Sequence, residues 1–218
     1  MTACSLMTGP GPDDLLATVD ACVAVLRPLL DQDWDVPARG LDWTCRETLE
    51  HVCGLGYAPV LATRATSFRP LALTVAPGAP LDDLLWTVEV MTRILAEVAR
   101  AAPPTARAYH PAGTADPGGF LAMGMDELLV HTVDITDGLG AGSTPDERLV
   151  TLVLDRLFPW WPRDTEPWRA LLWANGRVDL PGRPSLGAAW VWHCAPLDEW
   201  DGAVPRWDPA AGRLAAPG

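Results

Sequence analysis

The chain has 218 residues, and its 28 acidic against 16 basic residues give a formal net charge of −12. All basic residues are arginine and form no basic stripe, which argues against a nucleic-acid-binding surface. No segment approaches the roughly 20 uninterrupted apolar residues of a membrane span, and the first residues lack the features of a signal peptide. Five cysteines without a CxxC pair predict reduced thiols, so we expect a cytoplasmic protein.

Apolar residues at helical spacing predict three helices in the first half of the chain. Pro28 is expected to bend or end the first of them. The second begins with a capping box, in which Thr44 and Glu47 satisfy each other's backbone amides. Gly54 and Gly56 weaken this helix, although its apolar pattern resumes after them. The predicted ranges are 12–30, 44–61 and 81–101.

A fourth helix is predicted within 115–140, and the chain is organised around it. Asp116 suits its N-cap, Pro117 suits its first turn and Gly138 suits a left-handed exit. Most of its circumference is apolar, which is typical of a buried helix rather than a surface helix. A narrow polar seam interrupts the apolar surface and consists of Gly124, Glu127, His131 and Asp134.

Glu127 and His131 are four residues apart, so both side chains point the same way along the helix. This spacing allows a carboxylate and an imidazole to bind one cation. The alternative is a Glu/His pair that neighbouring groups satisfy, although buried charge is costly unless it is paired or bound to metal. Gly124, one turn earlier, leaves room for a ligand or for a neighbouring helix.

Beyond this helix we expect a fifth helix over 146–158 and a short one over 166–173. The composition changes at Pro159, and eight of the eleven tryptophans follow it. We therefore divide the chain into a helical bundle (1–158) and a Trp- and Pro-rich, loop-rich extension (159–218). Such aromatic residues either anchor the extension on the bundle or line a ligand pocket.

A third candidate ligand, His51, lies one turn after Glu47 on the second helix. In an up-down bundle the second and fourth helices can face each other across the core, where bundle proteins place metal sites. Two imidazoles and one carboxylate leave a coordination position open for water or substrate. Taken alone, a histidine in this position is more often a satisfied histidine of the core or its boundary than a ligand.

The motif at 43–52, WTCRETLEHV, resembles the W-T-x-R-x-x-x-x-H opening of DinB-like proteins. More specifically, it resembles the N-terminal domain of mycothiol-dependent maleylpyruvate isomerases. The stretch 127–134, ELLVHTVD, is similar to the second metal motif of that family, E-x-x-x-H-x-x-D. The two motifs occur in the family's order, about eighty residues apart, and the resemblance spans roughly 10–158.

The resemblance implies an all-α, DinB-like four-helix bundle that binds a divalent metal, usually zinc, through His51, Glu127 and His131. It also implies that a metal-bound thiolate is the reacting group, with mycothiol as the cosubstrate. Asp134 would orient the His131 ring. The isomerase carries a C-terminal α/β module, whereas this chain has a short Trp-rich segment, so the metal site carries over better than the thiol cosubstrate or the isomerisation.

His110 lies in the loop before the fourth helix and is our candidate catalytic residue. It would swing over the metal as a fourth ligand or act as an acid–base group. The alternative is a loop histidine that bonds to backbone.

The sequence therefore predicts a metal-dependent enzyme that activates a mycothiol-type thiol for transfer to, or isomerisation of, a small electrophile. The Trp-rich extension would wall an apolar substrate pocket. One alternative is a hydrolase or Lewis-acid enzyme that uses the same site without a thiol. The other is a non-catalytic bundle that binds small molecules. A homodimer is compatible with each of these, and no nucleic-acid or membrane partner is expected.

Overall fold

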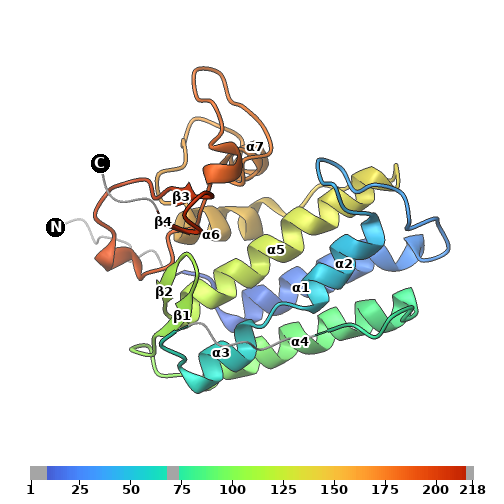
Figure 1. Ribbon diagram of the computed structural model, residues 1–218, viewed down its shortest axis with the longest axis horizontal. Coiled ribbons are helices and arrows are strands. Elements are labelled where there is room, and N and C mark those ends of the chain that lie inside the picture. The colour runs from blue at the N-terminus through green and yellow to red at the C-terminus, as the bar shows by residue number, and fades with distance from the viewer. Residues whose placement is uncertain (1–8, 68–73, 215–218) are drawn as a thin grey trace.

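The computed structural model describes residues 9–67 and 74–214, and most of the ordered elements are helices. Figure 1 shows α1, α2, α4 and α5 lying lengthwise beside one another. α1 and α2 each contact both α4 and α5. Their bounds are Pro12–Leu26 (α1), Cys45–Cys53 (α2), Leu81–Ala101 (α4) and Pro117–Gly138 (α5). The predicted mostly helical fold is thus confirmed, and within the described ranges no helix has the length and apolarity to cross a membrane.

The first two predicted helices end or break at the residues that disfavour helix. α1 ends at Leu26 and is followed by a short 3₁₀ turn, η1 (Arg27–Leu29), that contains Pro28.

At the start of α2 the Thr44 hydroxyl accepts a hydrogen bond from the Glu47 amide at 3.1 Å, and the Glu47 carboxylate accepts one from the Thr44 amide at 2.8 Å. The predicted capping box is therefore confirmed.

The helix expected over 44–61 is divided in two at its glycines. α2 ends at Cys53, and α3 (Tyr57–Thr63) begins just after Gly56. Gly54 and Gly56 bracket the break, in keeping with the low helix propensity of glycine. The Tyr57 ring, at the start of α3, is buried, and its hydroxyl reaches Glu127 on α5.

The N-terminus of α5 is as predicted, but its C-terminus is not. The Asp116 carboxylate accepts a 2.8 Å hydrogen bond from the Gly119 amide, and Pro117 opens the helix. The prediction that Gly138 supplies a left-handed exit is wrong, because the helix includes Gly138 and Gly140 adopts the positive φ of 71°. At Gly138 an added Cβ would lie 2.6 Å from the Pro37 carbonyl oxygen. Glycine is needed there for close packing rather than for its φ.

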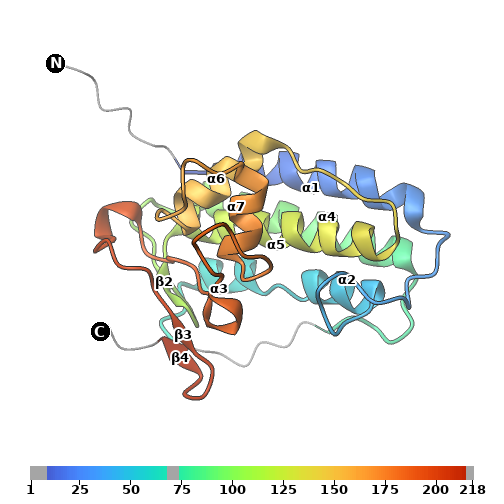
Figure 2. The same cartoon turned by 90° about the horizontal axis from the view of Figure 1, so that it is seen from above.

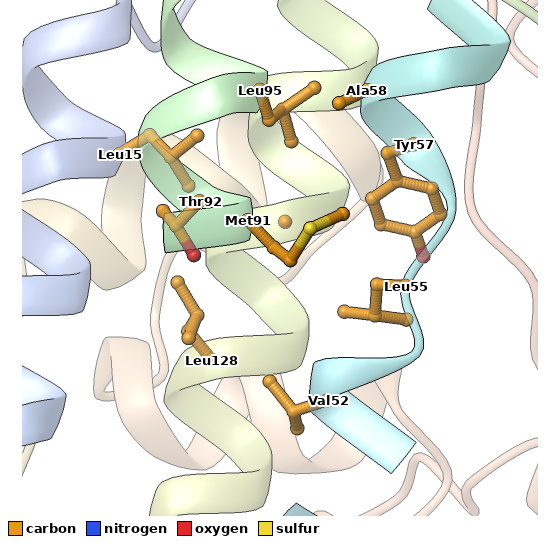
Figure 3. Close-up of a pocket in the computed structure, with 10 residues that line it drawn as sticks. Leu15, Val52, Leu55, Tyr57, Ala58, Met91, Thr92, Leu95 and Leu128 are labelled. Atoms are coloured by element: carbon orange, nitrogen blue, oxygen red, sulfur yellow. The ribbon is translucent and has the colours of Figure 1, made fainter. Parts of the chain in front are cut away.

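The space beside Gly124 is filled by neighbouring helices rather than by a ligand. An added Cβ at Gly124 would lie 3.2 Å from the tip of Leu95 on α4 and 3.4 Å from the tip of Leu15 on α1. These side chains border a small cavity of about 20 Å³, which Figure 3 shows together with Met91 and Tyr57. The leucine tips therefore have free space into which they can move.

The two glycines of α5 predict opposite responses to alanine. Gly138→Ala is expected to destabilise the protein by about 1–3 kcal/mol, because the new methyl group meets a backbone carbonyl that cannot move away. Gly124→Ala is expected to be neutral or to stabilise by up to about 1 kcal/mol, because alanine restricts the unfolded chain and the leucine tips can adjust. Urea denaturation of both variants measures the difference. Equal losses of stability would contradict this account of the two positions.

The remaining elements cover one side and one end of the bundle. Figure 2 shows α6 beside α5, with α7 next to α6. Two short antiparallel hairpins, β1–β2 and β3–β4, were not expected in an all-α fold. The bounds are Ala108–His110 (β1), Gly113–Ala115 (β2), Glu147–Leu157 (α6), Pro167–Ala174 (α7), Gly187–Ala189 (η2), Leu197–Glu199 (η3), Trp207–Asp208 (β3) and Arg213–Leu214 (β4).

Arg156 of α6 forms hydrogen bonds both to the C-terminal extension and to Asp116 at the start of α5. Its side chain is 4% exposed, and its guanidinium donates hydrogen bonds to the Asp116 carboxylate at 2.5 Å and to the carbonyl oxygens of His193 and Cys194 at 3.2 and 2.9 Å. Trp161 and Trp192 are both buried. Both lie in the same apolar core as residues of the helices.

Candidate metal centre

Three predicted ligands from two helices converge at one point. His51 lies in the last turn of α2, and Glu127 and His131 lie one turn apart on α5. The Glu127 Oε2 atom is 3.3 Å from His51 Nε2 and 3.1 Å from His131 Nε2. The three ligand atoms all lie within 4.8 Å of one another. The packing of α2 against α5 therefore brings together residues 76 positions apart in sequence.

The spacing of these atoms fits a divalent metal. In a tetrahedral zinc site with bonds of about 2.0–2.2 Å, ligand atoms lie roughly 3.3–3.6 Å from one another. The nitrogen-to-oxygen distances of 3.3 and 3.1 Å are close to that spacing. Two neutral imidazoles and one carboxylate are also a donor set that suits zinc and leaves a coordination position open.

The His131 ring is held in the orientation that a ligand needs. Asp134 Oδ2 lies 3.1 Å from His131 Nδ1, as their spacing in the helix predicts, so Nε2 faces Glu127. The same Asp134 oxygen accepts a 2.8 Å hydrogen bond from Arg177. Arg177 follows α7, and nothing in the sequence near it indicates a role in the site. The extension thus supports the ligand set through Asp134.

Hydrogen bonds also determine the charge of this cluster. Burial alone would raise the pKa of Glu127, but hydrogen bonds from His131 and His51 outweigh burial and hold that pKa well below its usual range. Burial alone would lower the pKa of His131, but hydrogen bonds to Asp134 and Glu127 raise it to about 9. The Tyr57 hydroxyl donates to Glu127 Oε1 at 3.3 Å and fixes the other carboxylate oxygen. Glu127 is therefore an oriented anion, ready to bind a cation.

A cavity of about 210 Å³ opens beside the three ligands. Its walls come from the loop before α2, from α5 and from the C-terminal extension, and they include Trp43, Trp190 and Trp192. The buried Asp126 carboxyl also lines it and accepts hydrogen bonds from Trp192 Nε1 at 2.8 Å and Asn175 Nδ2 at 3.1 Å. Burial raises the pKa of Asp126 to about 7, and these hydrogen bonds partly offset that effect.

His110 lies apart from the metal cluster, in β1. Its ring packs between Tyr57 and Trp192, with centroid distances of 5.9 and 5.4 Å. Its Nδ1 accepts a 3.1 Å hydrogen bond from the Ala112 amide, as the alternative interpretation of a backbone-bonded histidine predicts. The Cys194 sulfur is 3.8 Å from the same nitrogen. The structure does not bring His110 to the three ligands, and its catalytic role stays a prediction.

The burial of His110 predicts a loss of stability in acid. Burial lowers the pKa of its imidazole from 6.5 to about 4, against an opposing effect of the Glu127 charge. Between pH 6.5 and about pH 4 the unfolded chain binds a proton at His110 that the folded protein does not bind. The contribution of the buried, neutral His110 to the free energy of unfolding is therefore complete above pH 6.5 and is lost as the pH approaches 4. At pH 5 the loss is about 2 kcal/mol.

Urea denaturation of the wild type and of His110→Asn at pH 7.5 and pH 5 tests this prediction. Asparagine keeps an acceptor for the Ala112 amide but does not titrate. The wild type should lose about 2 kcal/mol more than the variant between the two pH values. An equal loss in both proteins would assign the acid sensitivity to other groups.

Comparison with known proteins identifies the family. Residues 15–136, more than half of the chain, match the family model described as mycothiol maleylpyruvate isomerase N-terminal domain. The match includes both motifs that contain the three candidate ligands and stops before the Trp-rich extension. No curated protein and no solved structure matches the chain.

Proposed function

Because the chain belongs to the mycothiol maleylpyruvate isomerase N-terminal domain family, we propose that it is a divalent-metal-dependent enzyme acting with a mycothiol-type thiol. The reaction is transfer of the thiol to a small electrophile, or isomerisation of that electrophile. The observation that carries the proposal is the convergence of His51, Glu127 and His131 beside a cavity large enough for a small ligand. We further infer that α1, α2, α4 and α5 form the DinB-type four-helix bundle within a domain spanning 1–158.

In this proposal His51, Glu127 and His131 hold the metal, and their chemistry favours zinc. When bound, the metal lowers the pKa of a thiol and favours its thiolate form. On metal binding His131 would release its Nε2 proton, and Asp134 would keep the remaining proton on Nδ1. Tyr57 orients the Glu127 carboxylate through its hydrogen bond to Oε1. Residues of the extension close one side of the cavity, namely Asn175, Arg177, Trp190 and Trp192.

Mycothiol binding to the cobalt(II)-substituted protein tests the use of a thiol without knowledge of the electrophile. Direct sulfur-to-cobalt coordination produces a charge-transfer absorption band in the near ultraviolet. We expect this band to appear on titration with mycothiol and to be absent when glycerol is added instead. If cobalt binds but mycothiol produces no band, the thiol-dependent mechanism is wrong. The alternative in which the same site activates water or a carbonyl would then lead.

A further inference from the structure

The two histidines of the candidate centre are held in different ways. His131 is buried, and its Nδ1 lies 3.1 Å from the Asp134 carboxylate. The His51 side chain is 36% exposed, and among the described residues its ring has one hydrogen-bonding partner, Glu127, at Nε2. Nε2 is the atom that faces the metal position, so a bound metal takes the place of that contact. Within the described ranges, no hydrogen bond from a side chain then holds the His51 ring.

The indole of Trp43 lies against the His51 ring. The two ring centroids are 5.0 Å apart, and the ring planes are inclined at 42°. The second ring nitrogen of a metal-binding histidine almost always bonds a carboxylate, a carbonyl or water, and a protein partner there fixes the ring. At His51 this role falls to aromatic packing, because water on its exposed side is mobile and cannot fix the orientation of the ring.

The backbone on both sides of Trp43 is held by hydrogen bonds. The Trp43 carbonyl accepts one from the Ala38 amide at 2.9 Å, and the next residue, Thr44, is the N-cap of α2 in the capping box with Glu47. Side chains of a helix lean toward its N-terminus, so His51, in the last turn of α2, leans back toward the indole. The sequence before α2 therefore supplies a fixed base for the contact.

The loop before α2 carries two tryptophans with different surroundings. Trp34 is 3% exposed, and its Nε1 donates a 2.9 Å hydrogen bond to the Leu29 carbonyl, as expected of a residue of the core. Trp43 is 41% exposed, and its ring centroid is 6.4 Å from that of His131 in addition to its contact with His51. So exposed a ring buries less apolar surface than Trp34 does, which favours a role at the metal site over a role in the core.

We propose that Trp43 is a positioning residue that holds the His51 ring in the orientation that binds the metal. The inference rests on the proposed function, because it takes His51 as a ligand. Without the indole the His51 side chain has more rotamers available, and metal binding must then select one of them at a cost in entropy. Trp43 is uncharged, so its replacement by another apolar residue leaves the charges of the centre as they are.

The zinc affinity of the full-length protein, measured by competition with a fluorescent chelator, tests the proposal. Trp43→Leu should bind zinc about 3- to 10-fold more weakly than the wild type, because an aromatic contact holds a ring less firmly than a hydrogen bond to a carboxylate. Trp43→Phe keeps an aromatic ring at this position and should bind zinc more tightly than Trp43→Leu. Circular dichroism checks that both variants are folded.

Trp86→Leu is the matched control for these variants. Trp86 is 62% exposed on α4 and does not line the cavity beside the ligands. The substitution removes an exposed tryptophan of the same kind, so the zinc affinity should stay at the wild-type value.

A double-mutant cycle with His51→Ala separates positioning of His51 from a general effect on the fold. If Trp43 acts through His51, Trp43→Leu should have little further effect on zinc affinity once the imidazole is absent. An unchanged affinity in Trp43→Leu, an equal loss in Trp43→Phe, or the same loss with and without His51 would each overturn the proposal.

The same samples separate this inference from the proposed function. A wild type that holds zinc with an affinity independent of Trp43 would overturn the inference and leave the metal-dependent function standing. Weaker zinc binding by Trp43→Leu, together with no sulfur-to-cobalt band on addition of mycothiol, would support the inference and overturn the thiol-dependent function. A wild type that binds no zinc would overturn both.

Discussion

Glu127→Gln is expected to weaken zinc binding by roughly 100-fold or more while the protein stays folded. The Oε2 atom of Glu127 is the point at which both Nε2 atoms converge, so the substitution removes the central anionic ligand of the set. Glutamine has nearly the same size, and its amide can still accept a hydrogen bond from Tyr57. Competition with a fluorescent zinc chelator measures the affinity, and circular dichroism checks the fold.

Glu97→Gln is the matched control for this variant. Glu97 lies on the exposed face of α4, where it pairs with Arg100, and its side chain is 69% exposed. The Glu97→Gln substitution removes one negative charge from the protein without a change at the candidate metal centre, so the zinc affinity should stay at the wild-type value. Equal zinc affinities of Glu127→Gln and the wild type would exclude Glu127 as a ligand.

The second large effect is expected at Arg156, which joins the extension to the bundle. Arg156→Met should lower the free energy of unfolding by about 3–5 kcal/mol. The substitution leaves the Asp116 carboxylate without its buried cation, and it leaves the carbonyl oxygens of His193 and Cys194 without their donor. Methionine retains much of the apolar volume, so the loss reports the polar contacts rather than a cavity.

Urea denaturation measures this loss, and Arg148→Met is the comparison. Arg148 lies on the same helix and bonds Asp14 at 2.7 Å, but its side chain is 63% exposed, so little change is expected. If the two variants were equally stable, the buried contacts of Arg156 would not be what holds the extension in place.

Features with a local cause could be predicted from the sequence. The helix expected over 81–101 has those bounds in the structure, because acidic residues and a continuous apolar stripe define it. The Thr44 and Glu47 capping box and the Asp116 cap depend on contacts three residues apart, and both are present. The resemblance to the isomerase family rested on two such local motifs, and the family match confirms it.

Features that depend on distant contacts were predicted less well. Spacing alone could not show that His51 meets α5, and that expectation came from bundle geometry and from the resemblance. Arg177 was missed because only the packing of the extension brings it to Asp134. Gly138 was misread because a helix-ending glycine and a closely packed glycine look the same in sequence, and only the approach of Pro37 distinguishes them.

Metal analysis of the purified protein, beside His131→Ala and His193→Ala, tests the central claim most directly. His193 serves as the control, because it lies in the extension and its ring nitrogen Nε2 is 3.3 Å from the Pro196 carbonyl oxygen. We predict about one zinc or similar divalent ion per chain in the wild type and in His193→Ala, and none in His131→Ala. Absence of metal from the wild type, even after incubation with zinc, would contradict the account and leave a helical bundle that binds small molecules.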